Sequence, residues 1–389
     1  MPEAPRRPRS ALAAATMLNL PLGSLYAYSV FLAPMERELG LTRAELSIVF
    51  ALATIAFTAG MMGAPRLFGR APVPALVAAC AAAAAGGIAL AAVARGFVEL
   101  ALGYGLMFGL GGGVSYILVQ QVVNLLQWRR PGLVNGYIVS LYPIGAMIAA
   151  PVFGWALERF GLRATLGGLA ATMAVTGLAT AALIARVGVA PRRPAAGVAT
   201  TRDSALQRFV FWHMWLVFLL AAAAGLTVMS QAAGIIRAYG GAATVALVGT
   251  TAITGAIAAA RLTGGWLIDR FPPPYVMAGA QAFALSGTVI LTLWPGSILS
   301  IPALAMIGMG YGFISGSTAG AITVYWPKEA YGRVAGNLYA GWCLAAVTLP
   351  VLAGYLFDLT GGYRAAIIVA GAGNLLGILV ASRLPRPSR

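Results

Sequence analysis

The apolar residues of this chain occur in about a dozen blocks of roughly twenty residues, each long enough to cross a hydrocarbon layer of about 30 Å as a helix. Soluble domains carry roughly 25% charged residues, whereas only 9% of these 389 residues are charged and 60% are hydrophobic. This excludes a soluble enzyme, a disulfide-framed secreted domain and an outer-membrane barrel, whose strands alternate in shorter pieces. The sequence predicts an all-α polytopic membrane protein with twelve transmembrane helices, near residues 11–33, 44–64, 75–94, 98–125, 133–157, 164–186, 211–236, 242–268, 275–294, 298–325, 333–357 and 364–383.

The basic residues indicate how the chain crosses the membrane. Met1 to Arg9 leads into a block that is longer than the apolar core of a signal peptide, so we expect the first span to be retained. Twelve spans put both termini on one side, and the arginines that fall on the opposite side are Arg37, Arg43, Arg95, Arg159, Arg163, Arg237 and Arg364. Except for Arg261, all other lysines and arginines fall on the side of the termini, which the positive-inside rule places in the cytoplasm. We therefore expect a multi-pass protein of a bacterial-type inner (plasma) membrane, with a net charge of +16 that sets orientation rather than binding nucleic acid.

The chain divides into two halves that resemble each other. The longest polar stretch, 188–208, predicts a cytoplasmic linker between a six-helix half at 1–187 and another at 209–389. An internal repeat supports this division, because Trp128, Gly132, Gly136, Pro151, Gly154 and Glu158 recur in the same order as Trp326, Gly332, Gly336, Pro350, Gly354 and Asp358. Glycines also recur at four-residue spacing in the fourth span (Gly105, Gly109, Gly113) and in the tenth (Gly308, Gly312, Gly316, Gly320). Such stripes predict close helix packing within lipid, and a sliding surface is the alternative.

Two six-span halves in a parallel repeat, joined by a basic linker, resemble the major facilitator superfamily over essentially the whole chain. Gly265-Trp266-Leu267-Ile268-Asp269-Arg270, after span eight, is similar to the G-x-L-x-D-R signature of that superfamily. The resemblance implies that Asp269 and Arg270 are gating residues, since the family's acid caps a neighbouring helix and pairs with arginines that keep the cytoplasmic side shut. A solvated turn is the alternative. The first half has only Gly63-Ala64-Pro65-Arg66, with proline where the acid belongs.

Within the superfamily, the first span resembles the oxalate/formate antiporter family and its monocarboxylate-porter relatives. The similarity lies in Asn19, Pro21, Gly23, Tyr26 and Tyr28, together with the arginine inside span eight. It implies a carrier of small organic anions.

Arg261 is the charged residue that lies clearly within the body of a predicted span. A charge there costs about 2.5 kcal/mol or more, so it needs a partner or a wet cavity. Arg261 precedes Asp269 by about 12 Å of helix rise, and its side chain should lean toward the membrane midplane. No aspartate or glutamate occurs at a comparable depth in the sequence, so we expect a substrate carboxylate to pair with the guanidinium fork. A snorkelling or carbonyl-paired arginine is the alternative.

Aromatic residues are the other candidates for a substrate site. The resemblance implies that five of them match positions facing the family's central cavity: Tyr26, Tyr116, Tyr311, Tyr339 and Trp342. Tyrosine offers an apolar wall and a hydroxyl, which suits a small amphipathic anion, although packing or interface roles are equally compatible. The oxalate pattern has a lysine at the position of Trp342, so its loss favours a monoanion. The polar residues Gln120, Gln121, Asn124 and Asn337 are candidates too, with helix–helix hydrogen bonding as the main alternative.

The sequence thus favours a secondary transporter of small monocarboxylates such as lactate, pyruvate, formate or acetate, working by alternating access as an anion exchanger or a proton symporter. The alternatives are a carrier of an unrelated solute, including a drug exporter, or a non-transporting sensor. No nucleophile and base pair, nucleotide loop or metal-ligand spacing is present in the sequence, so we expect no enzyme, cofactor or metal. We expect a monomer in the lipid bilayer. His213, the single histidine, is a possible proton carrier, with a position at the membrane interface as the alternative.

Overall fold

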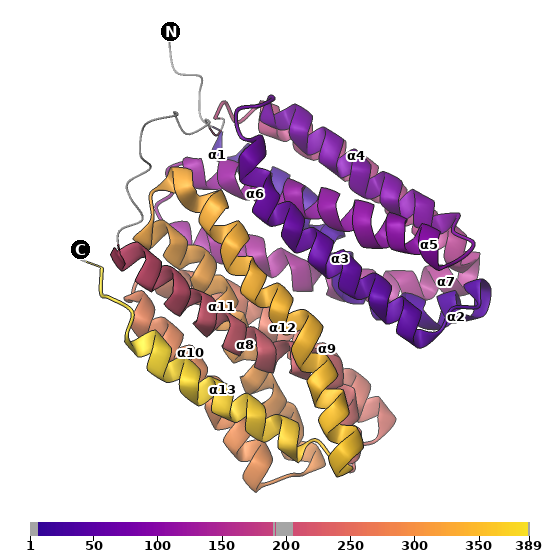
Figure 1. Cartoon of the computed structure of the whole chain (residues 1–389), viewed down its shortest axis with the longest axis vertical. Helices are drawn as coiled ribbons and strands as arrows, with labels where there is room; N and C mark the ends of the chain where they lie inside the picture. The colour runs from indigo at the N-terminus through magenta and orange to yellow at the C-terminus, as the bar shows by residue number, and fades with distance from the viewer. Residues whose placement is uncertain (1–6, 190, 192–204, 388–389) are drawn as a thin grey trace. The chain divides into compact units, whose positions relative to one another are not determined.

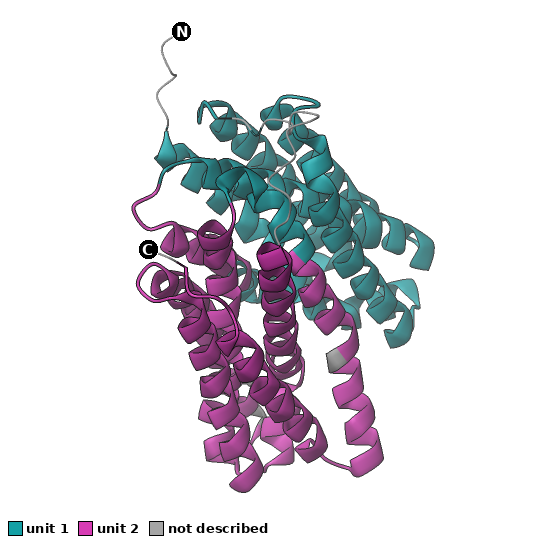
Figure 2. Ribbon diagram, turned by 60° about the vertical axis from the view of Figure 1, so that its left-hand side comes forward, with its two compact units in different colours: residues 1–127, 144–200, 327–337 teal, residues 128–143, 201–326, 338–389 magenta. Residues whose placement is uncertain are grey.

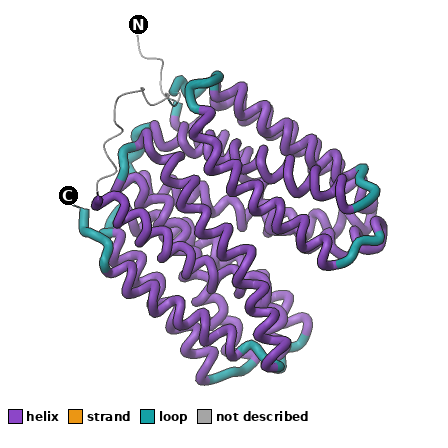
Figure 3. Tube along the Cα trace, in the orientation of Figure 1, coloured by secondary structure: helices purple, strands orange, loops and turns teal. Residues whose placement is uncertain are grey.

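A computed structural model describes residues 7–189, 191 and 205–387, and every regular element in these ranges is helical (Figures 1 and 3). Most of the predicted linker, at 190 and 192–204, lies outside the described residues. The elements are α1 (Pro8–Leu22), η1 (Gly23–Phe31), α2 (Leu32–Leu39), α3 (Arg43–Gly63), η2 (Ala64–Leu67), α4 (Val73–Ala92), α5 (Phe97–Leu100), η3 (Ala101–Phe108), α6 (Gly109–Leu125), α7 (Pro131–Ala185), α8 (Ala205–Ala238), α9 (Ala243–Ile268), α10 (Pro273–Leu293), α11 (Ser297–Tyr325), η4 (Lys328–Ala330), α12 (Tyr331–Thr360) and α13 (Arg364–Ser382).

The helices match the predicted spans closely. Among the described residues, 10 helices are long and apolar enough to cross a membrane. One of them, α7, contains the fifth and sixth predicted spans, which meet at Gly161, where φ is +77° and the helical path is broken. The first predicted span corresponds to the run α1, η1 and α2, which is interrupted by nine residues of 3₁₀ winding. The fold is therefore the predicted all-α, multi-pass architecture, and it accommodates twelve spans.

The chain forms two compact units, which Figure 2 colours separately. Unit 1 comprises 1–127, 144–200 and 327–337, and unit 2 comprises 128–143, 201–326 and 338–389. Each unit is thus mainly one half of the sequence together with the first turns of one helix from the other half. The start of α7, through Pro143, belongs to unit 2, whereas the start of α12, through Asn337, belongs to unit 1.

The glycine stripes are buried in tight helix contacts, as the sequence predicts. In unit 1, a Cβ on Gly109 or Gly113 would overlap the backbone of α3 at Ala53 or Phe57. In unit 2, a Cβ on Gly312 or Gly316 of α11 would overlap the backbone of α9 in the same way. Because a bare backbone face lets two helices approach closely without lipid between them, these stripes hold α3 against α6 and α9 against α11. The second contact fixes the position of Arg261.

Candidate functional site

Arg261 lies on α9, seven residues before the helix ends at Ile268, in a part of the helix that is rich in small residues. Gly264, three residues after Arg261, packs on the α11 backbone at Phe313. Gly316 of α11 packs on the carbonyl of Arg261 itself. The α9 backbone is therefore held on α11 directly beside the arginine. The long side chain of Arg261 is then the part of the residue that reaches neighbouring helices.

The guanidinium of Arg261 is buried within unit 2. The residue is 3% exposed. Its Nη1 donates to the backbone carbonyl of Val139, on the first part of α7, at 2.9 Å, and its Nη2 donates to the hydroxyl of Tyr311, on α11, at 3.0 Å. Both acceptors are neutral dipoles, so neither cancels the positive charge. In the described structure Arg261 is therefore paired with a carbonyl, which is the alternative to pairing with a substrate carboxylate.

Tyr311 is joined to the arginine in two ways. Its hydroxyl accepts the hydrogen bond from Nη2, and its ring centroid lies 5.1 Å from the Cζ of Arg261. The side chain is 1% exposed and packs on Gly225 of α8, where a Cβ would overlap the ring carbons. Close packing therefore fixes the ring, and the fixed ring orients one arm of the guanidinium fork.

The other predicted binding residues are distributed over both units. Tyr339 and Trp342 lie on α12 in unit 2; the Tyr339 ring meets Phe218 edge-on at 5.6 Å, and Trp342 is buried. Tyr26, on η1, and Tyr116, on α6, belong to unit 1. Two of the six predicted substrate-binding residues, Arg261 and Tyr311, are joined by the hydrogen bond described above.

Two polar candidates on α6 in unit 1, Gln120 and Asn124, make hydrogen bonds within their own helix. Gln120 donates to the Tyr116 hydroxyl at 3.0 Å, and Asn124 donates to the Gln120 carbonyl at 2.9 Å, both four residues apart on the same helix. His213, near the start of α8, has Nδ1 2.8 Å from the carbonyl of Phe209.

Asp269, directly after α9, caps the amino-terminal end of α7 within unit 2. Its Oδ1 accepts from the backbone N–H of Gly132 at 2.7 Å, and its Oδ2 accepts from that of Leu133 at 2.8 Å. A carboxylate stabilises a helix amino terminus by pairing with N–H groups that have no partner within the helix. The capping contact implied by the family resemblance is therefore present. Arg270 places its Cζ 3.8 Å from the centre of the Trp266 ring.

A different residue caps the start of α12, where the repeat lacks an acid. The N–H of Gly332, which corresponds to Gly132 in the repeat, donates to Oε1 of Gln121 at 2.6 Å. The Nε2 of Gln121 donates to the Lys328 carbonyl at 2.9 Å, and the Lys328 ammonium donates to the Leu126 carbonyl at 3.0 Å. Gln121 is fully buried on α6 in unit 1. A neutral amide thus holds this helix start, while a carboxylate holds the other.

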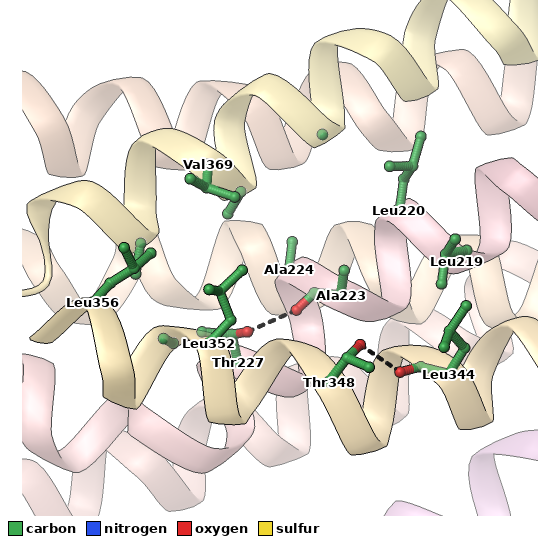
Figure 4. Close-up of a pocket in the computed structure, with 14 residues that line it drawn as sticks. Leu219, Leu220, Ala223, Ala224, Thr227, Leu344, Thr348, Leu352, Leu356 and Val369 are labelled. Carbon is green, nitrogen blue, oxygen red and sulfur yellow. Dashed lines mark hydrogen bonds between the residues drawn. The ribbon is translucent and has the colours of Figure 1, made fainter.

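An apolar groove of about 280 Å³ lies between α8, α12 and α13 in unit 2 (Figure 4). Its two threonines turn their hydroxyls onto their own helices: Thr227 donates to the Ala223 carbonyl and Thr348 to that of Leu344 (Figure 4). The remaining lining consists of aliphatic residues and glycine. Because an anion needs convergent donors, this groove does not provide an anion site.

The comparisons with known proteins agree with this fold. A family model of the Major Facilitator Superfamily matches residues 12–336 and, in a second match, 236–389. The chain belongs to this superfamily of transporters. Two solved structures share its fold: an MFS transporter, FucP, in the outward conformation (16% identity, TM-score 0.70, 97% of this chain and 99% of that one) and the E. coli fucose:proton symporter FucP (15%, TM-score 0.69, 97% and 98%).

The chain is also similar in sequence to curated proteins that have a more specific name than the superfamily. Monocarboxylate transporter 13 of Bos taurus is 28% identical over 310 residues, which cover 77% of this chain and 70% of the relative. Monocarboxylate transporter 11 of Mus musculus is 27% identical over 324 residues, with 77% and 70% coverage. This major facilitator chain is therefore similar to proteins named as monocarboxylate transporters.

Proposed function

We propose that this major facilitator protein is a secondary carrier of small monocarboxylates, working by alternating access, with Arg261 as the residue that binds the carboxylate. The observation that carries the proposal is the guanidinium buried in unit 2, whose Nη1 and Nη2 donate to a backbone carbonyl and a phenol hydroxyl. A carboxylate offers two anionic acceptors in the geometry of the guanidinium fork, and it cancels the charge as neutral dipoles do not. The similarity to monocarboxylate transporters 13 and 11 supports the same substrate class.

The proposed substrate is a monoanion with a small apolar body, of the lactate, pyruvate, formate or acetate type. One guanidinium matches one carboxylate. Trp342 stands where the oxalate carrier pattern has a second cation, and it adds an apolar wall instead of a charge. The tyrosines proposed to enclose the substrate body are Tyr26, Tyr116, Tyr311 and Tyr339.

We propose anion exchange as the transport mode, with proton symport as the competing mode. Arginine keeps its proton in proteins, so the charge of Arg261 is present in the empty carrier and is compensated when a carboxylate binds. Symport is possible where the substrate brings its own proton. In both modes Asp269 and Arg270 are proposed to act as gating residues.

Uptake into proteoliposomes tests the substrate class and the role of Arg261. Labelled lactate or pyruvate should accumulate in vesicles with the wild-type chain, and unlabelled monocarboxylates should compete more strongly than oxalate or neutral solutes. Arg261→Ala should reduce uptake by at least about a hundredfold, because the loss of a hydrogen-bonded charge pair costs roughly 3–5 kcal/mol. Arg261→Lys should rescue poorly, since an ammonium lacks the bidentate fork.

Arg237→Ala is the matched control, because Arg237 is an exposed arginine at the end of α8. It should leave uptake unchanged. Melting temperature and elution volume in detergent would establish that each variant is folded. Uptake at the wild-type rate in Arg261→Ala would refute the carboxylate-anchor role.

A further inference from the structure

The Val139 carbonyl, which Arg261 contacts, differs from most carbonyls of α7 because a proline lies four residues after it. In an α-helix the carbonyl of residue 139 accepts from the N–H of residue 143, but residue 143 is Pro143, which has no N–H. Val139 therefore presents a helix carbonyl that lacks its intrahelical donor, inside an apolar region where such a group needs a partner. The Nη1 of Arg261 supplies the donor at 2.9 Å.

This hydrogen bond is the second of two that fix the start of α7 on α9. Asp269 holds the first turn through Gly132 and Leu133, and Arg261 holds the third turn through Val139. Between them the two helices touch through glycines, since a Cβ on Gly265 would come within 2.7 Å of the Gly136 Cα. The held segment ends at Pro143, and α7 belongs to the other compact unit from Ile144 onward.

We infer that a carboxylate bound at Arg261 displaces the Val139 carbonyl, and that this displacement frees the start of α7 to leave α9. The inference rests on the proposed function and adds how substrate binding is transmitted to the gate. The same nitrogen, Nη1, donates to the Val139 carbonyl in the empty carrier and to the substrate carboxylate in the loaded one.

The chemistry favours this exchange of acceptors. A charge-assisted hydrogen bond to a carboxylate is roughly twice as strong as one to a neutral acceptor. A ligand shifts a conformational equilibrium only by binding one state better than the other, and here the state with α7 released leaves Arg261 free for the carboxylate. Asp269 still binds the first turn of α7 when a carboxylate is bound. Substrate binding therefore removes one of the two contacts that fix the start of α7 on α9. This shifts the population toward the released state without releasing the helix start completely.

A cysteine at position 268 measures the release of α7. Ile268 is 7% exposed and packs near Gly320 of α11, at a point where Gly132 of α7 is also in contact. It lies seven residues from Arg261, about 10 Å along the helix, so a bound monocarboxylate does not cover it. In a chain carrying Ile268→Cys, with Cys80→Ser and Cys343→Ser, the rate of alkylation by a water-soluble maleimide reports the population in which the start of α7 has moved away.

The test compares two prolines of α7. Pro143→Ala restores an N–H that binds the Val139 carbonyl within the helix, so the hold by Arg261 weakens without any ligand. We expect the alkylation rate to rise roughly two- to tenfold, as the loss of one net hydrogen bond predicts. Pro151→Ala is the matched control, because it supplies an N–H to Met147 in the other unit, and it should leave the rate unchanged. Saturating lactate or pyruvate should raise the rate with Pro143 in place and have a smaller effect in Pro143→Ala.

Arg261→Ala breaks the same hydrogen bond from its other end, so it must also raise the rate and abolish the effect of ligand, whether or not Pro143→Ala folds. If labelled monocarboxylates bind the wild-type chain but neither ligand nor these variants change the rate, the inference is wrong and the proposed function stands. If no monocarboxylate binds, the proposed function fails, and the inference fails with it because its displacing ligand is lost.

Discussion

At the residue scale, Arg261 is a permanent charge placed among apolar helices, and its neighbours decide what that charge can do. Burial strengthens each of its electrostatic interactions because the local dielectric is low. The two acceptors at Nη1 and Nη2 are a carbonyl and a hydroxyl, which stabilise the guanidinium but leave its net charge in place. A site of this kind selects for an anion by charge and for a carboxylate by the geometry of the fork.

We expect Tyr311 to affect transport through the orientation of Arg261. Tyr311→Phe keeps the ring on Gly225 and beside the guanidinium but removes the acceptor of Nη2. Since a hydrogen bond to a charged group contributes about 1.5–3 kcal/mol, we expect the KM for lactate to rise roughly tenfold or more. Uptake measured over a range of lactate concentrations gives this value. Tyr325→Phe, on the same helix with its hydroxyl on the Pro385 carbonyl, is the control and should keep the wild-type KM. An unchanged KM in Tyr311→Phe would show that Tyr311 is a packing residue.

In the proposed site, Trp342 stands where a second cation would favour a dianion. Trp342→Lys adds a second cation, so uptake of lactate should fall while competition by oxalate becomes stronger. The ratio of the oxalate and lactate inhibition constants, measured in the same vesicles, is the deciding quantity. Trp342→Phe keeps an apolar ring and should preserve the preference for monoanions. A wild-type chain that already prefers oxalate to lactate would contradict the monoanion assignment.

The sequence reveals a residue of this site when its side chain is unusual for its surroundings. Arg261 could be found because a charge inside an apolar block is costly. Val139 could not be found in this way, because its contribution is a backbone carbonyl, which every residue has. Its signal was Pro143, four residues later, which removes the intrahelical donor, but only the structure shows which side chain replaces that donor.

At the element scale, the two repeat-related helix starts are held by different chemistry. Asp269 binds two N–H groups of α7 with a full negative charge, whereas Gln121 binds one N–H of α12 with a neutral amide. The proline at position 65, in place of an acid, indicates that the first half has no carboxylate for this contact. It could not show that Gln121 replaces it, because Gln121 lies on a different helix and reaches Gly332 only in the folded chain.

Amide hydrogen exchange should separate these two holds. In Asp269→Asn, exchange should accelerate in the first turn of α7 and stay unchanged in the first turn of α12, and Gln121→Ala should give the reverse pattern. The effect of Asp269→Asn should be the larger, because a carboxylate at a partly buried helix amino terminus contributes up to about 2 kcal/mol. Peptides covering 131–137 and 331–337 provide the measurement. Acceleration in both peptides from either variant would mean that the two contacts open as one unit.

Helix positions were predictable because a block of about twenty apolar residues has one stable conformation in lipid, with all backbone groups bonded internally. The predicted start of α9 at residue 242 and its end at Ile268 agree with the structure to within one residue. The local windings were not predictable: η1 at Gly23–Phe31 is 3₁₀ and η3 at Ala101–Phe108 is π-helical. Apolar composition fits all three helix types, so packing, rather than hydropathy, selects among them.

At the scale of the whole molecule, the two compact units follow the two predicted halves of the sequence except at the start of one helix in each half. Each compact unit takes in the first turns of one helix from the other half, ending at Pro143 in α7 and at Asn337 in α12. The residues that hold these turns, Asp269 and Gln121, belong to the same units as the turns themselves. If the chain works by the proposed alternating access, we expect the strength of these two contacts to affect how readily it reorients.

The charge of Arg261 leads to an expectation for how transport is coupled. Arg261 keeps its charge and its hydrogen bond to the Val139 carbonyl, so reorientation of the empty chain should disrupt a buried charged contact. If a carboxylate binds as we propose, it should compensate the charge, replace the carbonyl and lower that barrier. We therefore expect lactate uptake into lactate-loaded vesicles to be faster than uptake into empty vesicles, and Pro143→Ala to narrow the difference. Equal initial rates in loaded and empty vesicles, together with acceleration by an inward proton gradient, would instead establish proton symport. In that case the proton carried with the substrate, rather than a second anion moving in exchange, would balance the charge of the transported anion.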